Sequence, residues 1–422
     1  MDDIRLALSS KPVIIILSIS LAIRIFFQFQ LLPNSASVFG PDERTYALLA
    51  KYVSQGLPVA EYPAYGPHLY NSSKSIILPS AFLIKLGLEE LTAVRTMASV
   101  YGLTSTILLA LSFIAYLRLR NQNIQELSSY MDKKFEFILV FFSFLPSNFI
   151  WSTLGLRESG SQFWLIMTFY LILKLLNSSG RDLWKFTALA AFALTFAYGT
   201  RPQTALVFSF VGLIFSLAVL LKFRKLMPLV AFSIGIFAGH AFTTTPTTPT
   251  TPTTINTLNA LQNQVLKVKV LQSIRNANTV GAQSALPIST CQSSSSEIFY
   301  LIKCSLSELP YRLFAFFFRP LIFFDQGSKT LNLAALENLG WMILVPLSVW
   351  VSLRRKENSL DRFINLSLTA YILLFASAAA LYEGNLGTAF RHKSTILWPL
   401  VFILMLAPGI LPKFKGKTKS FS

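Results

Sequence analysis

Long apolar runs constrain this chain more than any other feature. They alternate with short charged patches, and many approach the roughly 20 residues that an α-helix needs to cross a bilayer. The composition agrees, because 53% of the residues are hydrophobic and only 13% are charged. The runs are too continuous for the alternating pattern of barrel strands. The sequence therefore predicts an all-α polytopic membrane protein.

Hydropathy and length predict about ten membrane spans. The first apolar run lacks a small-residue cleavage site after a short core, so we expect it to be a retained span and not a signal peptide. In chain order the expected spans are Pro12–Leu32, Ala93–Leu117, Phe135–Thr153, Gly160–Leu176, Phe186–Tyr198, Gln203–Leu221, Met227–Phe242, Leu333–Leu353, Phe363–Leu381 and Ser394–Leu411.

Basic residues in short loops predict the orientation. They gather in Arg118–Lys134, Lys222–Lys225, Arg354–Arg362 and the tail Lys413–Lys419. Because Lys and Arg are enriched in cytoplasmic loops, we expect these segments and both termini to be cytoplasmic. The segments that carry the carboxylates then lie on the extracytoplasmic face of the plasma (inner) membrane.

The first outer segment, 34–92, is too long to be a simple connector. Its stretch Asp42–Gln55 places Tyr46, Leu49 and Val53 at helical spacing, which predicts an amphipathic helix along the interface. The stretch Ile76–Leu88 is apolar but short, and we also expect it at the interface. If it crossed the membrane, every later basic loop would change sides.

A second outer segment, 243–310, separates two membrane modules, 1–242 and 311–422. It opens with repeated Thr and Pro, which predicts an extended strap. The chain has only two cysteines, Cys291 and Cys304, and on an oxidising face we expect them to form a disulfide, the alternative being two free thiols. The aromatic stretch Tyr311–Phe324 is expected to be a half-inserted interfacial helix.

The net charge of +18 could suggest nucleic acid, but membrane topology and contact with anionic lipid explain the cytoplasmic basic residues. They do not explain four arginines at the outer ends of helices, Arg157, Arg201, Arg319 and Arg391. A single such arginine is usually an interfacial anchor. Four of them beside carboxylates make a phosphate-binding site an equal alternative, because a guanidinium matches phosphate oxygens.

The pair Asp42-Glu43 is the main catalytic candidate. A carboxylate at a membrane surface can accept a proton from an incoming hydroxyl or amine. The same residues, following Pro41, also suit the first turn of a helix. The two roles are compatible, since a capping turn can position a base.

The chain resembles a known family through motifs that share one side of the membrane and a fixed order. These are Asp42-Glu43 followed by Tyr46, the segment Val94–Gly102 opening the second span, Leu145-Pro146-Ser147, Leu156-Arg157-Glu158-Ser159, and Asn385–His392 before the last span. In this order they resemble the C-type multi-spanning glycosyltransferases, which include protein mannosyltransferases and the aminoarabinose transferases of lipid A.

The resemblance implies an inverting transfer of a sugar from a polyprenyl phosphate or diphosphate donor in an outward cavity. It implies that Asp42 is the base, with Glu43 as its alternate, and that Arg201 and Arg391 hold the departing phosphate. Tyr46, Arg157, Glu158 and His392 would line the cavity. The acceptor, whether glycan, lipid or protein, stays open, and the chain carries no large soluble C-terminal domain of the kind that many relatives have.

No cofactor is expected. Glu61 and His68 could join Asp42 around a divalent cation, but they form a weak ligand set. Two other functions stay open. A polymerase or ligase of the O-antigen type would also be polytopic with outer arginines. A transporter is less favoured, because we find no internal repeat and the charges lie at the outer rim.

Overall fold

The computed structural model describes residues 11–31, 41–59, 62, 66–120, 133–219, 298–323, 325, 329–354, 359–383 and 386–406. Within these residues the secondary structure is helical, with no strand. Six of the described helices are long and apolar enough to cross a membrane, so the protein is an α-helical, multi-pass membrane protein. They are α2 (Lys11–Phe26) with its continuation η1 (Phe27–Leu31), α6 (Glu90–Leu119), α10 (Arg157–Leu176), α16 (Lys329–Arg354), α17 (Ser359–Tyr382) and α18 (Leu386–Leu406).

The four remaining expected spans, the third, fifth, sixth and seventh, do not correspond to any of these six helices. The helices α11 (Arg181–Thr200) and α12 (Pro202–Val219) cover the fifth and sixth, but they are not among the six. The third is split in two, as described next. The seventh, Met227–Phe242, lies outside the described residues together with the Thr/Pro strap.

The expected span Phe135–Thr153 is broken at Leu145 into α8 (Lys133–Phe144) and α9 (Pro146–Thr153). Pro146 disfavours the helical conformation of the residue before it, and Leu145 is extended, with φ −56° and ψ 127°. The side-chain amide of Asn148 donates to the Phe142 carbonyl, at 2.6 Å, and so replaces one of the lost helical hydrogen bonds. Trp151 of α9 belongs to the same apolar cluster as Tyr46 and Ile76 of the outer segment.

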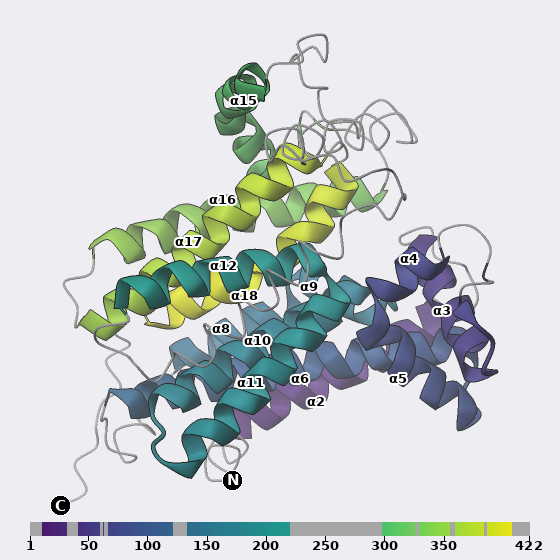
Figure 1. Ribbon diagram of the computed structural model, residues 1–422. Coiled ribbons are helices and arrows are strands. Elements are labelled where there is room, and N and C mark those ends of the chain that lie inside the picture. Colours follow the sequence, from purple (N-terminus) through teal and green to yellow (C-terminus); the bar gives the residue numbers. More distant parts are fainter. Residues whose placement is uncertain are drawn as a thin grey trace, which may run out of the picture.

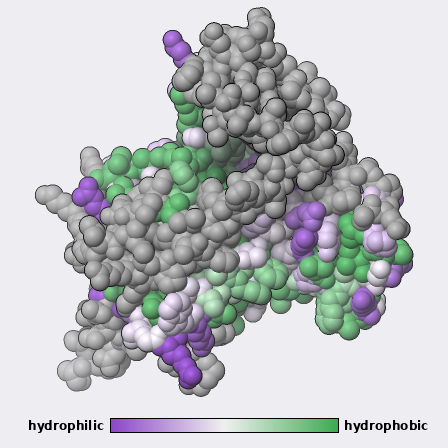
Figure 2. Space-filling model, in the orientation of Figure 1, coloured by the Kyte–Doolittle hydropathy of each residue, from purple (hydrophilic) through white to green (hydrophobic). Residues whose placement is uncertain are grey.

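The outer segment forms a small helical layer at one end of the bundle (Figure 1). It consists of α3 (Pro41–Ser54), α4 (Gly66–Asn71) and α5 (Lys74–Lys85). As the apolar spacing predicts, α3 buries Tyr46, Leu49 and Ala50 against α5 and α6. The 12 residues of α5 are too few to cross a bilayer. Figure 2 shows an apolar surface in this region, where Leu78, Phe82 and Leu86 are exposed.

The helix α15 (Ile298–Phe318) begins earlier than the aromatic stretch predicted and runs through Pro310. It packs against α16, α17 and α18, and its buried residues, Arg312, Ala315, Phe316 and Phe317, lie in its C-terminal half. Cys304 lies on this helix and is disulfide-bonded. Cys291 lies outside the described residues.

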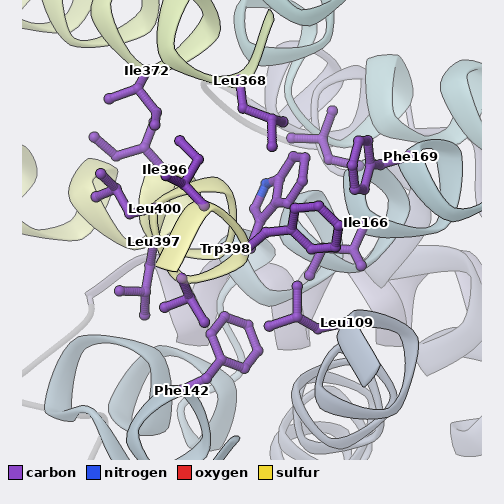
Figure 3. Close-up of a cluster of buried hydrophobic side chains, with 14 of the residues drawn as sticks. Leu109, Phe142, Ile166, Phe169, Leu368, Ile372, Ile396, Leu397, Trp398 and Leu400 are labelled. Carbon is purple, nitrogen blue, oxygen red and sulfur yellow. The ribbon is translucent and has the colours of Figure 1, made fainter. Parts of the chain in front are cut away.

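The core is built around α18, most of whose side chains are buried. Trp398, fully buried, lies at its centre, with its ring centroid 5.2 Å from that of Phe169 and 6.2 Å from that of Tyr371 (Figure 3). Helices α8, α9, α10, α16 and α17 all pack against α18. A rigid α18 fixes the positions of the charged residues in its first two turns, Arg391, His392 and Lys393.

The two ends of the bundle carry different charged groups. At the end away from α3, the carboxylate of Asp361 accepts a hydrogen bond from Tyr116 and lies 3.4 Å from a guanidinium nitrogen of Arg120. At the other end, the helix termini that meet α3 carry the residues that the sequence analysis selected.

Candidate functional site

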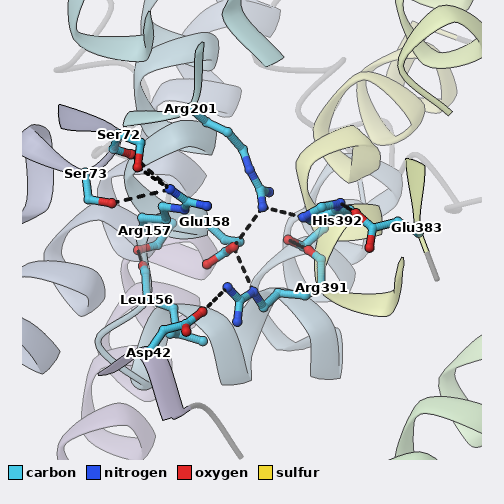
Figure 4. Close-up of polar contacts among 12 residues, drawn as sticks. Asp42, Ser72, Ser73, Leu156, Arg157, Glu158, Arg201, Glu383, Arg391 and His392 are labelled. Atoms are coloured by element: carbon cyan, nitrogen blue, oxygen red, sulfur yellow. Dashed lines mark hydrogen bonds and ion pairs between the residues drawn. The ribbon is translucent and has the colours of Figure 1, made fainter. Parts of the chain in front are cut away.

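Arg391 joins two carboxylates from distant parts of the chain (Figure 4). Its Nη2 lies 2.6 Å from Oδ2 of Asp42, and its Nε lies 2.9 Å from Oε1 of Glu158. Asp42 and Glu158 lie in the first turns of α3 and α10, where the N-terminal end of a helix favours negative charge. The arginine of α18 therefore holds the starts of these two helices together.

Arg201 extends the same series of contacts. It is the residue between α11 and α12, and its Nη2 lies 3.2 Å from Oε1 of Glu158. The same nitrogen is hydrogen-bonded to Nε2 of His392. Nδ1 of His392 lies 2.6 Å from Oε1 of Glu383, the residue that follows α17. Figure 4 shows one connected set of polar contacts from Asp42 to Glu383, which we call the charged cluster.

Arg157 attaches the outer segment to the charged cluster. Its Nη1 donates to the hydroxyl of Ser72, at 2.8 Å, and to the Ser72 carbonyl, at 3.2 Å. Ser72 lies in the turn between α4 and α5, directly after the last residue of α4. With Arg201 and Arg391, this side chain completes three guanidinium groups around Glu158 (Figure 4).

Only one carboxylate of the charged cluster is open to solvent. The side chain of Asp42 is 42% exposed, whereas that of Glu158 is 1% exposed and that of Glu383 is fully buried. Burial lowers the pKa of Arg201 to about 10, against the opposing charge of Glu158, so the guanidinium stays protonated at neutral pH. Solvent can therefore reach the carboxylate of Asp42 but not the other two.

Several buried polar atoms of the charged cluster have no hydrogen-bond partner among the described residues. They are Oε2 of Glu158, Nη1 of Arg201, Nε of Arg157 and the hydroxyl of the neighbouring Tyr46. Burial raises the pKa of Tyr46, so its hydroxyl keeps its proton and can donate. Buried polar groups are rarely left unpaired. Three of these atoms are donors that could bind the acceptor oxygens of a polar ligand, whereas Oε2 of Glu158 can only accept a hydrogen bond.

The structure does not bring Glu43 into the charged cluster. Its carboxylate receives two hydrogen bonds from Arg95, at 2.7 Å and 3.2 Å, and one from the backbone amide of Gly155, at 2.9 Å. The side chain is fully buried. The expectation that Glu43 could replace Asp42 as a base is therefore corrected, because an acceptor substrate cannot reach a fully buried carboxylate.

Arg319 also has a different partner. Its guanidinium binds Asp325, with Nε 3.0 Å from Oδ2. Burial alone would raise the pKa of Asp325, but the hydrogen bonds from Arg319 and from the Leu321 amide, with the charge of Arg319, lower it below its ordinary value. This pair shapes the turn after α15 and is not linked to the charged cluster by these contacts.

Among the described residues, no group of three His, Cys, Asp or Glu side chains is placed to hold a metal ion. Glu61 lies outside the described residues, and of His68 only its place on α4 is described. The cluster is built instead from pairs of opposite charge.

Sequence reasoning missed Glu383 and Arg95. Glu383 lies two residues before the Asn385–His392 motif, and its carboxylate could have been included with the other outer acids. Arg95 was treated only as part of the Val94–Gly102 segment. Comparisons with protein-family models, with curated protein sequences and with solved structures found no significant match.

Proposed function

We propose that the protein is a membrane glycosyltransferase. It would move a sugar from a polyprenyl phosphate or diphosphate donor to an acceptor on the extracytoplasmic face, with inversion at the anomeric carbon. The observation that carries this proposal is the composition of the charged cluster. Arg391 joins an accessible carboxylate, Asp42, to the buried Glu158, and beside Glu158 the guanidinium groups of Arg157 and Arg201 each have a donor without a partner among the described residues.

The unpartnered donors favour a phosphate group as ligand. Nη1 of Arg201 and the hydroxyl of Tyr46 could each donate to a phosphate oxygen, and charge-assisted hydrogen bonds of this kind are strong. As the glycosyl bond breaks, its electron pair moves to the phosphate oxygen. Fixed guanidinium groups stabilise that growing charge.

Arg391 would couple donor binding to the base. Its Nη2 is bound to Asp42, and a donor phosphate would compete for this guanidinium. Release of Asp42 frees its carboxylate to take the proton from the acceptor hydroxyl, while the oxygen of that hydroxyl forms the new bond to the anomeric carbon. Asp42 then carries the proton and the polyprenyl phosphate leaves.

The proposed topology has ten spans in the plasma (inner) membrane, with both termini in the cytoplasm and the charged cluster outside. The described helices fit alternate crossings if the segment Met227–Phe242 crosses once. The three-helix outer layer would lie on the outer leaflet, with the exposed apolar side chains of α5 in contact with lipid.

The test uses purified protein in lipid nanodiscs with a polyprenyl-phosphate-linked sugar. We expect Asp42→Asn to bind the donor nearly normally but to lower single-turnover transfer on the order of 10²–10⁴-fold, the usual effect of removing a general base. Arg391→Ala should also weaken donor binding. Asp182→Asn, an exposed acid in the first turn of α11 at the other end of the bundle, is the matched control. Full transfer by Asp42→Asn would refute the mechanism.

A further inference from the structure

We propose that Glu383 and His392 are positioning residues, which hold the guanidinium of Arg201 so that one of its nitrogens stays available to the donor phosphate. This inference rests on the proposed function and adds two residues to its machinery. Neither of them needs to touch the reacting atoms.

The hydrogen bonds determine which nitrogen of His392 carries the proton. Guanidinium nitrogens only donate, so Nε2 of His392 must accept from Nη2 of Arg201. The ring proton is then on Nδ1, which donates to Oε1 of Glu383 at 2.6 Å. A protonated imidazole would place a second donor and a second positive charge against Arg201. The contacts therefore require a neutral ring with its proton on Nδ1.

Glu383 is well placed to hold this tautomer. Its side chain is fully buried, and its backbone amide donates to the Ala379 carbonyl, at 2.8 Å, which continues the last turn of α17. A buried carboxylate that accepts from Nδ1 favours one tautomer and one ring orientation. The contact therefore fixes the His392 ring, on α18, relative to the end of α17.

The result is a guanidinium held at one nitrogen by two acceptors. Nη2 of Arg201 contacts Nε2 of His392 and also Oε1 of Glu158, at 3.2 Å. Because the guanidinium is planar and rigid, two acceptors on Nη2 also set the direction of Nη1. Nη1 has no partner in the described part of the chain. It is the donor that the proposed phosphate would occupy.

The first measurement needs no ligand. The chain has three histidines, so nitrogen NMR of protein labelled with ¹⁵N-histidine gives few signals, and those of His392 are the ones that His392→Gln removes. We expect Nδ1 protonated and Nε2 unprotonated in the wild type. Glu383→Leu should abolish this preference, while Glu383→Gln, whose amide oxygen can accept from Nδ1, should retain it. Glu337→Gln is the control, because Glu337 is also buried but binds Trp341 and Ser147.

The second measurement is binding of a polyprenyl phosphate by the same nanodisc samples. Glu383→Leu and His392→Leu should weaken binding roughly tenfold, as expected for the loss of one hydrogen bond to a charged group. His392→Gln can place an acceptor near the position of Nε2 and should recover most of the affinity. If both leucine variants are unfolded, the tautomer of His392 in the wild type still tests the inference, because a proton on Nε2 would overturn it.

The outcomes are distinct. A proton on Nε2 of His392 in the wild type, or unchanged affinity in folded leucine variants, would overturn the positioning role. If the wild-type protein carries the proton on Nδ1 of His392 but binds no polyprenyl phosphate, the proposed function would be overturned. Phosphate would then not be the ligand for which Arg201 is positioned.

Discussion

Arg95 binds Glu43 through both carboxylate oxygens, with Nε 2.7 Å from Oε1 and Nη2 3.2 Å from Oε2, and both side chains are buried. The amide of Gly155 donates to the same carboxylate. One glutamate thus links α3, α6 and the turn that leads into α10. The contact holds the outer layer to the bundle next to the charged cluster.

The first prediction concerns this buried pair. Glu43→Ala should lower the free energy of unfolding by about 3–5 kcal/mol, because it leaves the Arg95 guanidinium buried without its counter-ion. Asp42→Ala, which removes a half-exposed carboxylate, should change it by less than about 1 kcal/mol. Denaturant or thermal unfolding in a mild detergent measures both variants. Equal destabilisation would contradict the different roles assigned to these neighbours.

The contrast between Asp42 and Glu43 marks a limit of sequence analysis. The sequence predicts that α3 begins at these residues, and it does. Consecutive helical residues point in directions roughly 100° apart, so one neighbour can face the charged cluster while the next faces the core. Which one does so depends on how α3 packs against α6, and no local pattern encodes that packing.

Arg24 shows the same limit within a span. The sequence places this arginine inside the first apolar run and cannot name its partners. In the structure it is fully buried and donates to the hydroxyl of Ser152, to the Ser143 carbonyl and to Ser20. Two of these partners are more than 100 residues away in the chain. The apolar runs predict the helices, but only their packing reveals such contacts.

The second prediction tests the packing beside Arg24. A Cβ on Gly102 would lie 2.4 Å from Cβ of Ser152, so Gly102→Ala must displace the serine that binds Arg24. We expect a loss of about 1–3 kcal/mol in the free energy of unfolding, as for other overpacked cores. Gly340→Ala is the control, because nothing lies within 4 Å of the added carbon. It should be neutral or stabilise the helix by up to about 1 kcal/mol. Similar effects of the two alanines would contradict this packing.

The third prediction is a pH dependence at the turn after α15. The pKa of Asp325 is lowered below its ordinary value of 3.8 in the folded protein. A lowered folded pKa means that the carboxylate stabilises the fold fully above the ordinary value, and that this stabilisation disappears as the pH falls through the folded value. The difference in melting temperature between wild type and Asp325→Asn should therefore be constant from about pH 5 to 8 and shrink below about pH 4. A difference that grows on acidification would have the wrong sign.

The fourth prediction concerns orientation. Gln55 is exposed beside the outer helical layer, and Asp182 is exposed at the opposite end of the bundle, in the first turn of α11. In intact cells a membrane-impermeant thiol reagent should label Gln55→Cys but not Asp182→Cys. After permeabilisation both should react. Cys304 is disulfide-bonded and should contribute no background under oxidising conditions. Labelling of Asp182→Cys in intact cells would reverse the proposed topology.

The fifth prediction concerns Lys393, a fully buried cation in the second turn of α18. An ammonium has three donors, and here three oxygens face it: Oδ1 of Asn338 at 2.5 Å, the Arg319 carbonyl at 3.2 Å and the Phe317 carbonyl at 3.4 Å. Asn338→Leu should destabilise the protein by about 1–3 kcal/mol, because it deprives a buried charge of one acceptor. If Lys393→Met is added, the charge is gone and the missing acceptor no longer matters.

The double variant should therefore lose less stability than the sum of the two single variants, with an interaction free energy of about 0.5–3 kcal/mol. The four proteins of this cycle can be compared by urea unfolding in detergent micelles. Additive losses would mean that Lys393 does not depend on Asn338. A positive result would show that the start of α18, and with it Arg391 and His392, is held in place by contacts with the turn after α15 and with α16.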